Sequence, residues 1–133
     1  MKVLFVCAEN AERSQMAEAF ANHYGQGKIE ATSAGTMPKS EVNPLVAEAM
    51  QEKGIDVSKN RPRLVTNKMV QEADMIIVMG CNAQGFCPAP LLNKVVDWGI
   101  EDPKDKPIEK VREIRDEIER KVKQLIEESE TRT

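Results

Sequence analysis

The stretch that decides the fold is Lys2-Val-Leu-Phe-Val-Cys7-Ala-Glu-Asn-Ala-Glu-Arg13-Ser14-Gln-Met-Ala-Glu-Ala-Phe20. Its apolar beginning is typical of a buried parallel strand, and the residues from Ser14 onward are typical of a helix. Cys7, five further residues and Arg13 link the strand to the helix. A loop at such a junction turns backbone N–H groups inward, and the helix dipole adds partial positive charge. The stretch therefore predicts an oxyanion site at the end of the first strand.

Cys7 and Arg13 have the residue types that such a site needs. Arg13 would bind two oxygens of a tetrahedral anion as a rigid fork, and Cys7 would be held as a thiolate by the loop amides, Arg13 and the Ser14 hydroxyl. A thiolate beneath a bound oxyanion is a nucleophile. The alternative is a buried structural cysteine with a solvent-facing arginine, but the place at a strand–helix junction favours the functional interpretation. We expect the oxyanion-binding set to be Cys7, Ala8, Glu9, Asn10, Ala11, Glu12, Arg13 and Ser14.

Length and charge limit the other possibilities. The chain has 133 residues, enough for one domain with one core, and its formal net charge is -3 without a basic run, which argues against a nucleic-acid partner. No apolar run reaches the ~20 residues of a membrane span, and a strand follows Lys2 at once in place of a signal peptide, so we expect a cytoplasmic protein that acts away from membranes. One histidine and three scattered cysteines do not make a zinc site, so we expect neither metal nor cofactor.

The remaining sequence alternates strand-like and helix-like segments. Strands are expected at 2–6, 28–33, 74–79 and 94–98, and helices at 14–24, from Pro44 to Gly54, at 67–72 with Thr66 as cap, and at 108–128. This alternation predicts a single α/β domain over 1–133, a three-layer structure with a four-stranded parallel sheet and helices on both faces, and a frayed end at 130–133. No exposed apolar stripe requires a partner, so we expect a monomer.

Three further residues carry chemistry near the same sheet edge, because the carboxyl ends of parallel strands meet there. Asp102 is a candidate general acid, although an aspartate before a proline is also an ordinary turn residue. Cys81 and Cys87 lie on a segment rich in glycine and proline, and two such thiols can close a disulfide if their Cα atoms come within ~7 Å. With Cys7 at the same edge, exchange through mixed disulfides would make a thiol relay; two unrelated thiols are the alternative.

The chain resembles a known family over nearly its whole length. The residues that carry the resemblance are Cys7-x-x-Asn10-x-x-Arg13-Ser14-Gln-Met-Ala-Glu18, Ser33-Ala-Gly35, Asp74 with its apolar strand, and Trp98-Gly99-x-x-Asp102-Pro103. These are similar to the low-molecular-weight protein tyrosine phosphatase superfamily and, within it, to the thioredoxin-coupled arsenate reductases. The resemblance implies a phosphatase-like fold and a reductase in which Cys7 attacks arsenate, Asp102 protonates the departing oxygen, and Cys81 and Cys87 pass the disulfide outward to thioredoxin.

The chain departs from the family pattern in three places. Glycine usually stands where Glu9 is, so Glu9 is expected to take a backbone conformation that glycine supplies. The negative charges of Glu9 and Glu12 would weaken anion binding if the side chains pointed inward rather than to solvent. Cys81 is shifted by one position relative to the family. Some reductases bind potassium through residues that resemble Asn10, Glu18 and Ser33 plus an aspartate; Arg63 stands at the position of that aspartate, which predicts an internal cation instead.

Three functions remain open from the sequence. The first is arsenate reduction by the Cys7/Cys81/Cys87 relay. The second is phosphomonoester hydrolysis, which needs Cys7, Arg13 and Asp102 but neither downstream thiol. The third is an oxyanion-binding module whose acidic loop has lost catalysis.

Overall fold

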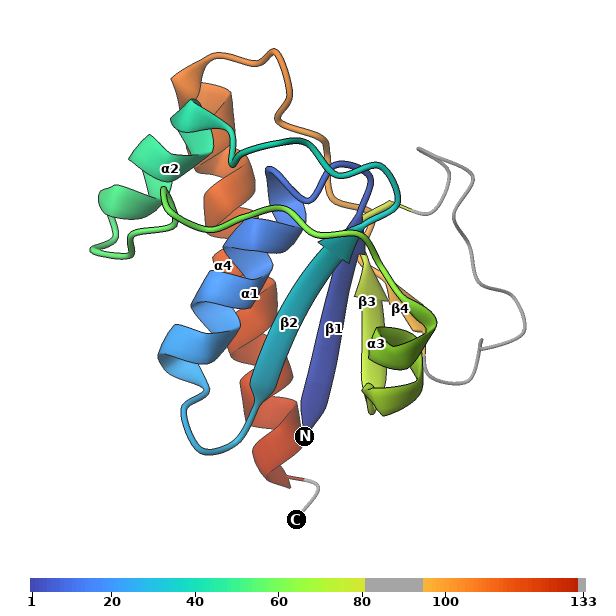
Figure 1. The fold of residues 1–133 in the computed structure, drawn as a ribbon. Coiled ribbons are helices and arrows are strands. Elements are labelled where there is room, and N and C mark those ends of the chain that lie inside the picture. Colours follow the sequence, from blue (N-terminus) through green and yellow to red (C-terminus); the bar gives the residue numbers. More distant parts are fainter. Residues whose placement is uncertain (81–94, 132–133) are drawn as a thin grey trace.

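The computed structural model describes residues 1–80 and 95–131. Four parallel strands form one sheet in the order β2-β1-β3-β4 (Figure 1). They are β1 (Lys2–Cys7), β2 (Glu30–Gly35), β3 (Met75–Val78) and β4 (Val95–Asp97). The prediction of an α/β fold with a four-stranded parallel sheet is confirmed.

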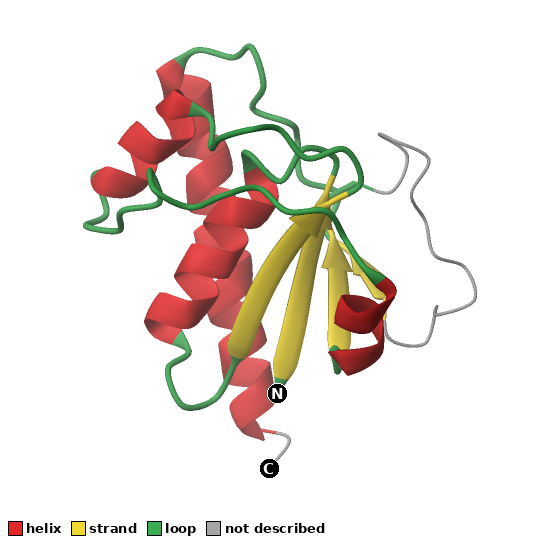
Figure 2. Ribbon diagram, viewed as in Figure 1, coloured by secondary structure: helices red, strands yellow, loops and turns green. Residues whose placement is uncertain are grey.

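Helices cover both faces of this sheet. Helix α1 (Arg13–Tyr24), α2 (Pro44–Gln51) and α4 (Ile108–Thr131) lie on one side, and the short α3 (Asn67–Glu72) lies on the other (Figure 2). Among the described residues, no helix is both long and apolar enough to cross a bilayer. The three expected layers are therefore present.

The alternation of β1 decides which core each side chain joins. Val3, Phe5 and Cys7 belong to the large cluster beneath α1 and α4, whereas Leu4 and Val6 belong to the small cluster beneath α3. Successive side chains of a strand point to opposite faces, so a strand that is apolar throughout must be covered on both. Fully burying a phenylalanine such as Phe5 contributes about 1.5–3 kcal/mol, so this packing fixes β1 in the middle of the domain.

Most element boundaries differ from the sequence-based expectation by one to three residues, and two of the differences have a contact that accounts for them. Strand β2 begins at Glu30 rather than at residue 28, because the amides of Lys28 and Ile29 both donate to the Gly25 carbonyl and complete the turn after α1. Helix α4 continues through Glu130 to Thr131, where we expected fraying to start at residue 130, and Glu130 forms an ion pair with Lys28. The predicted cap of α3 is confirmed, since the Thr66 side chain accepts from the Met69 amide, and the structure adds a cap on α2, where the Asn43 side chain accepts from the Leu45 amide.

The strand order places the functional residues. Strand β1 pairs with β2 on one side and with β3 on the other; from β1 the chain continues to β2 and from β3 to β4, so the connections from these two neighbouring strands lead in opposite directions. In open parallel sheets, ligands bind outside the carboxyl ends at such a switch point. Cys7 is the last residue of β1, and the loop to α1 begins directly after it.

Candidate active site

The loop over residues 8–12 is held by its carbonyl groups. Amides of the segment 36–43 donate to these carbonyls, in the pairs Thr36 to Cys7 (3.3 Å), Met37 to Ala8 (2.8 Å), Lys39 to Glu9 (3.0 Å) and Asn43 to Ala11 (3.0 Å). In a planar trans peptide the next N–H group points opposite to the carbonyl. The N–H groups of residues 8, 9, 10 and 12 therefore point away from this segment, as the expected anion site requires.

Gly35 allows the end of β2 to lie directly against this loop. A Cβ atom at this position would stand 2.5 Å from the Ala8 carbonyl oxygen and 2.9 Å from the Asn10 nitrogen. Both are backbone atoms, so no side-chain rotation would relieve the overlap. The glycine of Ser33-Ala-Gly35 is thus a packing requirement of the anion loop.

Asn10, not Glu9, carries the unusual conformation of the loop. Its φ is 51°, in the left-handed region that asparagine adopts more readily than most residues, so the expectation about Glu9 is wrong. The Asn10 side chain fixes this conformation: its amide nitrogen donates to Ser14 Oγ (2.7 Å) and Ser33 Oγ (3.0 Å), and its oxygen accepts from the Arg63 amide (2.9 Å).

Cys7 is buried at the floor of the loop. Its Sγ atom lies 2.9 Å from Ser14 Oγ. Because Ser14 Oγ accepts a hydrogen from Asn10, its own proton is available to donate to the sulfur. A thiolate at Cys7, which can only accept, would take this hydrogen bond from Ser14.

Two backbone carbonyls hold one nitrogen of the Arg13 guanidinium, and another of its nitrogens has no hydrogen-bond partner among the described residues. Its Nη1 donates to the carbonyl oxygens of Ile100 (2.8 Å) and Met79 (3.3 Å), and the side chain is only 5% exposed. Its Nε is buried without a hydrogen-bond partner among the described residues. A buried unpaired donor costs about 1–3 kcal/mol, which an oxyanion accepting from Nε and Nη2 would recover.

Asp102 lies at the edge of the same site. Its Oδ2 is 3.8 Å from Arg13 Nη2, farther than a hydrogen bond, and its Oδ1 accepts from the Lys104 amide at 3.0 Å. Gly80 also contacts the site, since a Cβ there would stand 3.3 Å from Arg13 Nη1. The next residue, Cys81, and Cys87 lie outside the described residues.

The two acidic residues of the loop have partners of their own. Glu9 forms ion pairs with Lys39 (3.5 Å) and Lys104 (3.2 Å). The Glu12 carboxylate is buried and accepts from the Asn43 side chain at 3.0 Å; burial is the main cause that raises the pKa of Glu12. Neither carboxylate faces solvent freely, and neither hydrogen-bonds to Cys7 or Arg13.

Glu18 accepts the last hydrogen bond of a chain that leads from Asn10 through Ser33. Ser33 Oγ donates to its carboxylate at 2.6 Å. Burial raises the pKa of Glu18, while the hydrogen bond from Ser33 and the positive charge of Arg63 oppose that rise. Arg63 thus supplies positive charge to this end of the network, where the sequence predicts an internal cation.

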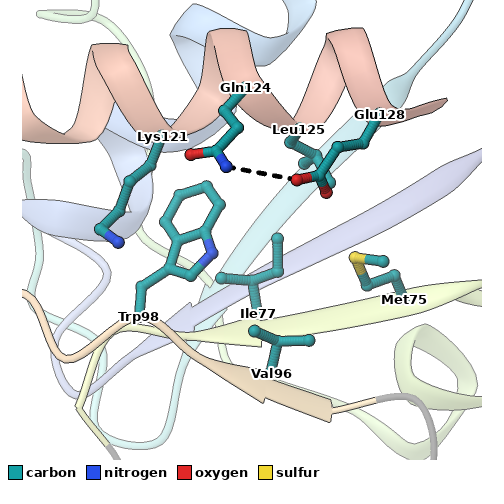
Figure 3. A pocket seen from close by; sticks show the side chains of 8 residues that line it. All are labelled: Met75, Ile77, Val96, Trp98, Lys121, Gln124, Leu125 and Glu128. Carbon is teal, nitrogen blue, oxygen red and sulfur yellow. Dashed lines mark hydrogen bonds between the residues drawn. The ribbon is translucent and has the colours of Figure 1, made fainter. Parts of the chain in front are cut away.

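A separate pocket of about 280 Å³ lies between the sheet edge and the second half of α4 (Figure 3). Trp98 and Val96 of the sheet side face Lys121, Gln124 and Glu128 of α4. The residues described around this pocket include neither Cys7, Arg13 nor Asp102, so it is separate from the expected oxyanion site.

The comparisons with known proteins agree with this geometry. Residues 2–132 match the family model of low molecular weight phosphotyrosine protein phosphatases. The chain belongs to this family. The resemblance to its arsenate reductases is also confirmed: the chain is 37% identical over 129 residues to a putative arsenate reductase of Halobacterium salinarum, covering 93% of this chain and 89% of that protein.

Solved structures of both activities share the fold. The thioredoxin-dependent arsenate reductase of Corynebacterium glutamicum is 35% identical with a TM-score of 0.82, and the match covers 99% of this chain and 63% of that one. The YwlE arginine phosphatase of Geobacillus stearothermophilus is 26% identical with a TM-score of 0.88, covering 98% and 94%. The fold is therefore common to reductase and phosphatase, and the side chains of the site must distinguish them.

Several residues of the site escaped sequence reasoning. The carbonyls of Met79 and Ile100 hold Arg13 across 66 and 87 positions of the chain, and a carbonyl carries no sequence signal. Lys39 and Lys104 are ordinary loop lysines by sequence. A glutamate at position 9, where the family has glycine, was the one signal that an extra contact existed.

Proposed function

We propose that this protein reduces arsenate to arsenite by a thiol relay. The observation that carries the proposal is the unpaired Nε of buried Arg13 beside a nucleophile that Ser14 is positioned to hold as a thiolate. Together with the loop amides, this arrangement suits an anion with several acceptor oxygens, such as a tetrahedral oxyanion, rather than a neutral ligand. Arsenate and phosphate share that shape and charge, so both are expected to bind.

The steps balance in electrons and protons. Cys7 thiolate attacks arsenic(V), and the displaced hydroxide takes a proton from Asp102 and leaves as water. Cys81 thiolate then attacks the Cys7 sulfur; the sulfur–arsenic bond breaks, its electron pair stays on arsenic, and arsenite leaves. Cys87 thiolate attacks Cys81, which frees Cys7 and leaves a Cys81–Cys87 disulfide. Thioredoxin, the reductant named for the related reductase, would supply the next two electrons.

The covalent structure supports the second step. Gly80 lies against the Arg13 guanidinium, and Cys81 is the next residue along the chain.

Phosphomonoester hydrolysis is the second candidate. Its specific support is the match of residues 2–132 to the family model of low molecular weight phosphotyrosine protein phosphatases, because phosphotyrosine is a phosphomonoester. Cys7 would attack phosphorus while Asp102 protonates the departing alcohol oxygen; water would then attack the phosphorus, and the sulfur–phosphorus bond would break with its electron pair returning to Cys7.

A single-turnover experiment separates the two functions. Fully reduced protein is mixed with arsenate without reductant, and lost thiols, released arsenite and the disulfide map are recorded. The relay predicts two lost thiols and one arsenite per chain with a Cys81–Cys87 bridge. Cys87→Ser should stop at a Cys7–Cys81 bridge, while Cys81→Ser and Cys7→Ser should release no arsenite.

The opposite result would refute the relay. No arsenite from the wild-type protein, with phosphate-ester hydrolysis that is indifferent to Cys81→Ser and Cys87→Ser, would identify a phosphatase. Multiple turnover of arsenate in the presence of thioredoxin and thioredoxin reductase tests whether thioredoxin is the reductant. Cys87→Ser is the matched variant: it should release arsenite once and then fail in multiple turnover.

A further inference from the structure

Glu9 joins the anion loop to two other loops at the mouth of the site. Its Oε1 lies 3.5 Å from Lys39 Nζ, and its Oε2 lies 3.2 Å from Lys104 Nζ. The Glu9 side chain is 18% exposed, against 44–45% for the two lysines, so it is the inner member of the group.

Lys104 connects this group to Asp102. Its amide donates to Asp102 Oδ1 at 3.0 Å, while its ammonium group donates to Glu9 Oε2 at 3.2 Å. The other Asp102 oxygen faces Arg13 Nη2 at 3.8 Å. The loop that carries Asp102 therefore meets the anion loop at two points, Arg13–Asp102 and Glu9–Lys104.

We propose that Glu9 is a positioning residue that holds the Asp102 loop over the bound oxyanion through Lys104. This inference rests on the proposed function, in which Asp102 protonates the oxygen that leaves. Proton transfer needs the acid within hydrogen-bond reach of that oxygen, and a displacement of about 1 Å can cost a hundredfold in rate. The glutamate at a position where the family has glycine is thus an added contact rather than a defect of the loop.

A simpler effect of Glu9 must be separated from this one. A negative charge near the site would weaken anion binding through space, and removing it would strengthen binding. The two explanations differ in the behaviour of the partner lysine. Glu9→Gln removes a negative charge and Lys104→Met a positive one, so a through-space effect moves the two variants in opposite directions. Loss of positioning moves both in the same direction.

The experiment measures the single-turnover rate of arsenite release at saturating arsenate, and separately the Kd of inorganic phosphate. Glu9→Gln and Lys104→Met should each slow release about tenfold, a fraction of the 10²–10⁴-fold that general acid catalysis contributes. Lys39→Met is the matched control: it removes a lysine from the same carboxylate without touching the Asp102 loop, and its rate should stay within about twofold of wild type.

A double variant tests whether the effect passes through Asp102. Asp102→Asn alone should slow release strongly, and adding Glu9→Gln should slow it no further, because there is no acid left to position. Thermal unfolding of each variant should change little, since both lysines that pair with Glu9 are nearly half exposed and such ion pairs contribute little to stability.

Three results would overturn the inference: opposite changes in rate for Glu9→Gln and Lys104→Met, a slow Lys39→Met, or additive losses in the double variant. Failure of the proposed function looks different, since the wild-type protein would then release no arsenite. In that event the same variants are compared in the hydrolysis of phenyl phosphate, whose poor leaving group requires the same acid, and the same three results decide.

Discussion

Gly35→Ala should damage both the stability of the fold and the oxyanion site. The added Cβ would stand 2.5 Å from the Ala8 carbonyl oxygen, where ordinary contacts begin at 3.4 Å, so the anion loop must move by about 1 Å. Overpacking of this kind costs about 1–3 kcal/mol, which lowers the melting temperature of a chain of this size by roughly 4–10 °C. A shift of about 1 Å in the loop should slow the reaction of bound arsenate about a hundredfold.

Gly25→Ala is the matched control for this prediction. Its Cβ would stand 2.6 Å from the Ala21 carbonyl oxygen, nearly the same overlap, but at the end of α1 remote from Cys7. Melting temperature is measured in a buffer free of phosphate, and site integrity by the protection that phosphate gives Cys7 against iodoacetamide. Gly25→Ala should lose stability and keep protection, whereas Gly35→Ala should lose both. Wild-type stability and protection in Gly35→Ala would refute the packing argument.

Two further predictions follow from single contacts. Ser14→Ala removes the hydroxyl 2.9 Å from Cys7 Sγ and should slow the alkylation of Cys7 by iodoacetamide at pH 6 about tenfold, since a hydrogen bond to a charged group contributes about 1.5–3 kcal/mol. The circular dichroism spectrum should not change, and an unchanged alkylation rate would mean that Ser14 does not hold the thiolate. The hydrogen bonds from Arg112 are the main cause that lowers the pKa of Glu52 to about 2, so the stabilisation from Glu52 is present above its ordinary pKa of 4.5 and is lost as the pH falls toward 2. Glu52→Gln should therefore lower the urea midpoint of unfolding at pH 7. A midpoint that is still lower than that of the wild type at pH 2 would contradict this linkage.

The parts of the fold that could be predicted depend on local patterns. The apolar run of β1, the cap at Thr66 and the helical repeat of α4 are each contained within one segment, and each was placed within a few residues. The start of β2 was misplaced by two residues because the turn after α1 closes on the Gly25 carbonyl, a choice that a short alternating segment does not show.

The candidate site likewise combines a local pattern with contacts between distant segments. Cys7, Arg13 and Ser14 belong to one strand–loop–helix unit, so their spacing alone indicated an oxyanion site. The role of Glu9 was not predictable, because it depends on lysines 30 and 95 positions away. The expectation for the left-handed residue was also wrong, since the Asn10 side chain donates to Ser33 Oγ and accepts from the Arg63 amide, and both partners lie far along the chain.

By itself, the sequence determined the α/β class and singled out Cys7 as candidate nucleophile and Arg13 as candidate anion-binding residue, because these predictions follow from periodicity and from spacing within one unit. Only the tertiary structure decided which edge of Arg13 stays free, why Gly35 must lack a side chain, and where the carboxylate of Glu9 goes. The physical reason is that backbone carbonyls, close backbone approaches and ion pairs between loops are set by packing between distant segments, and a linear pattern carries no record of them.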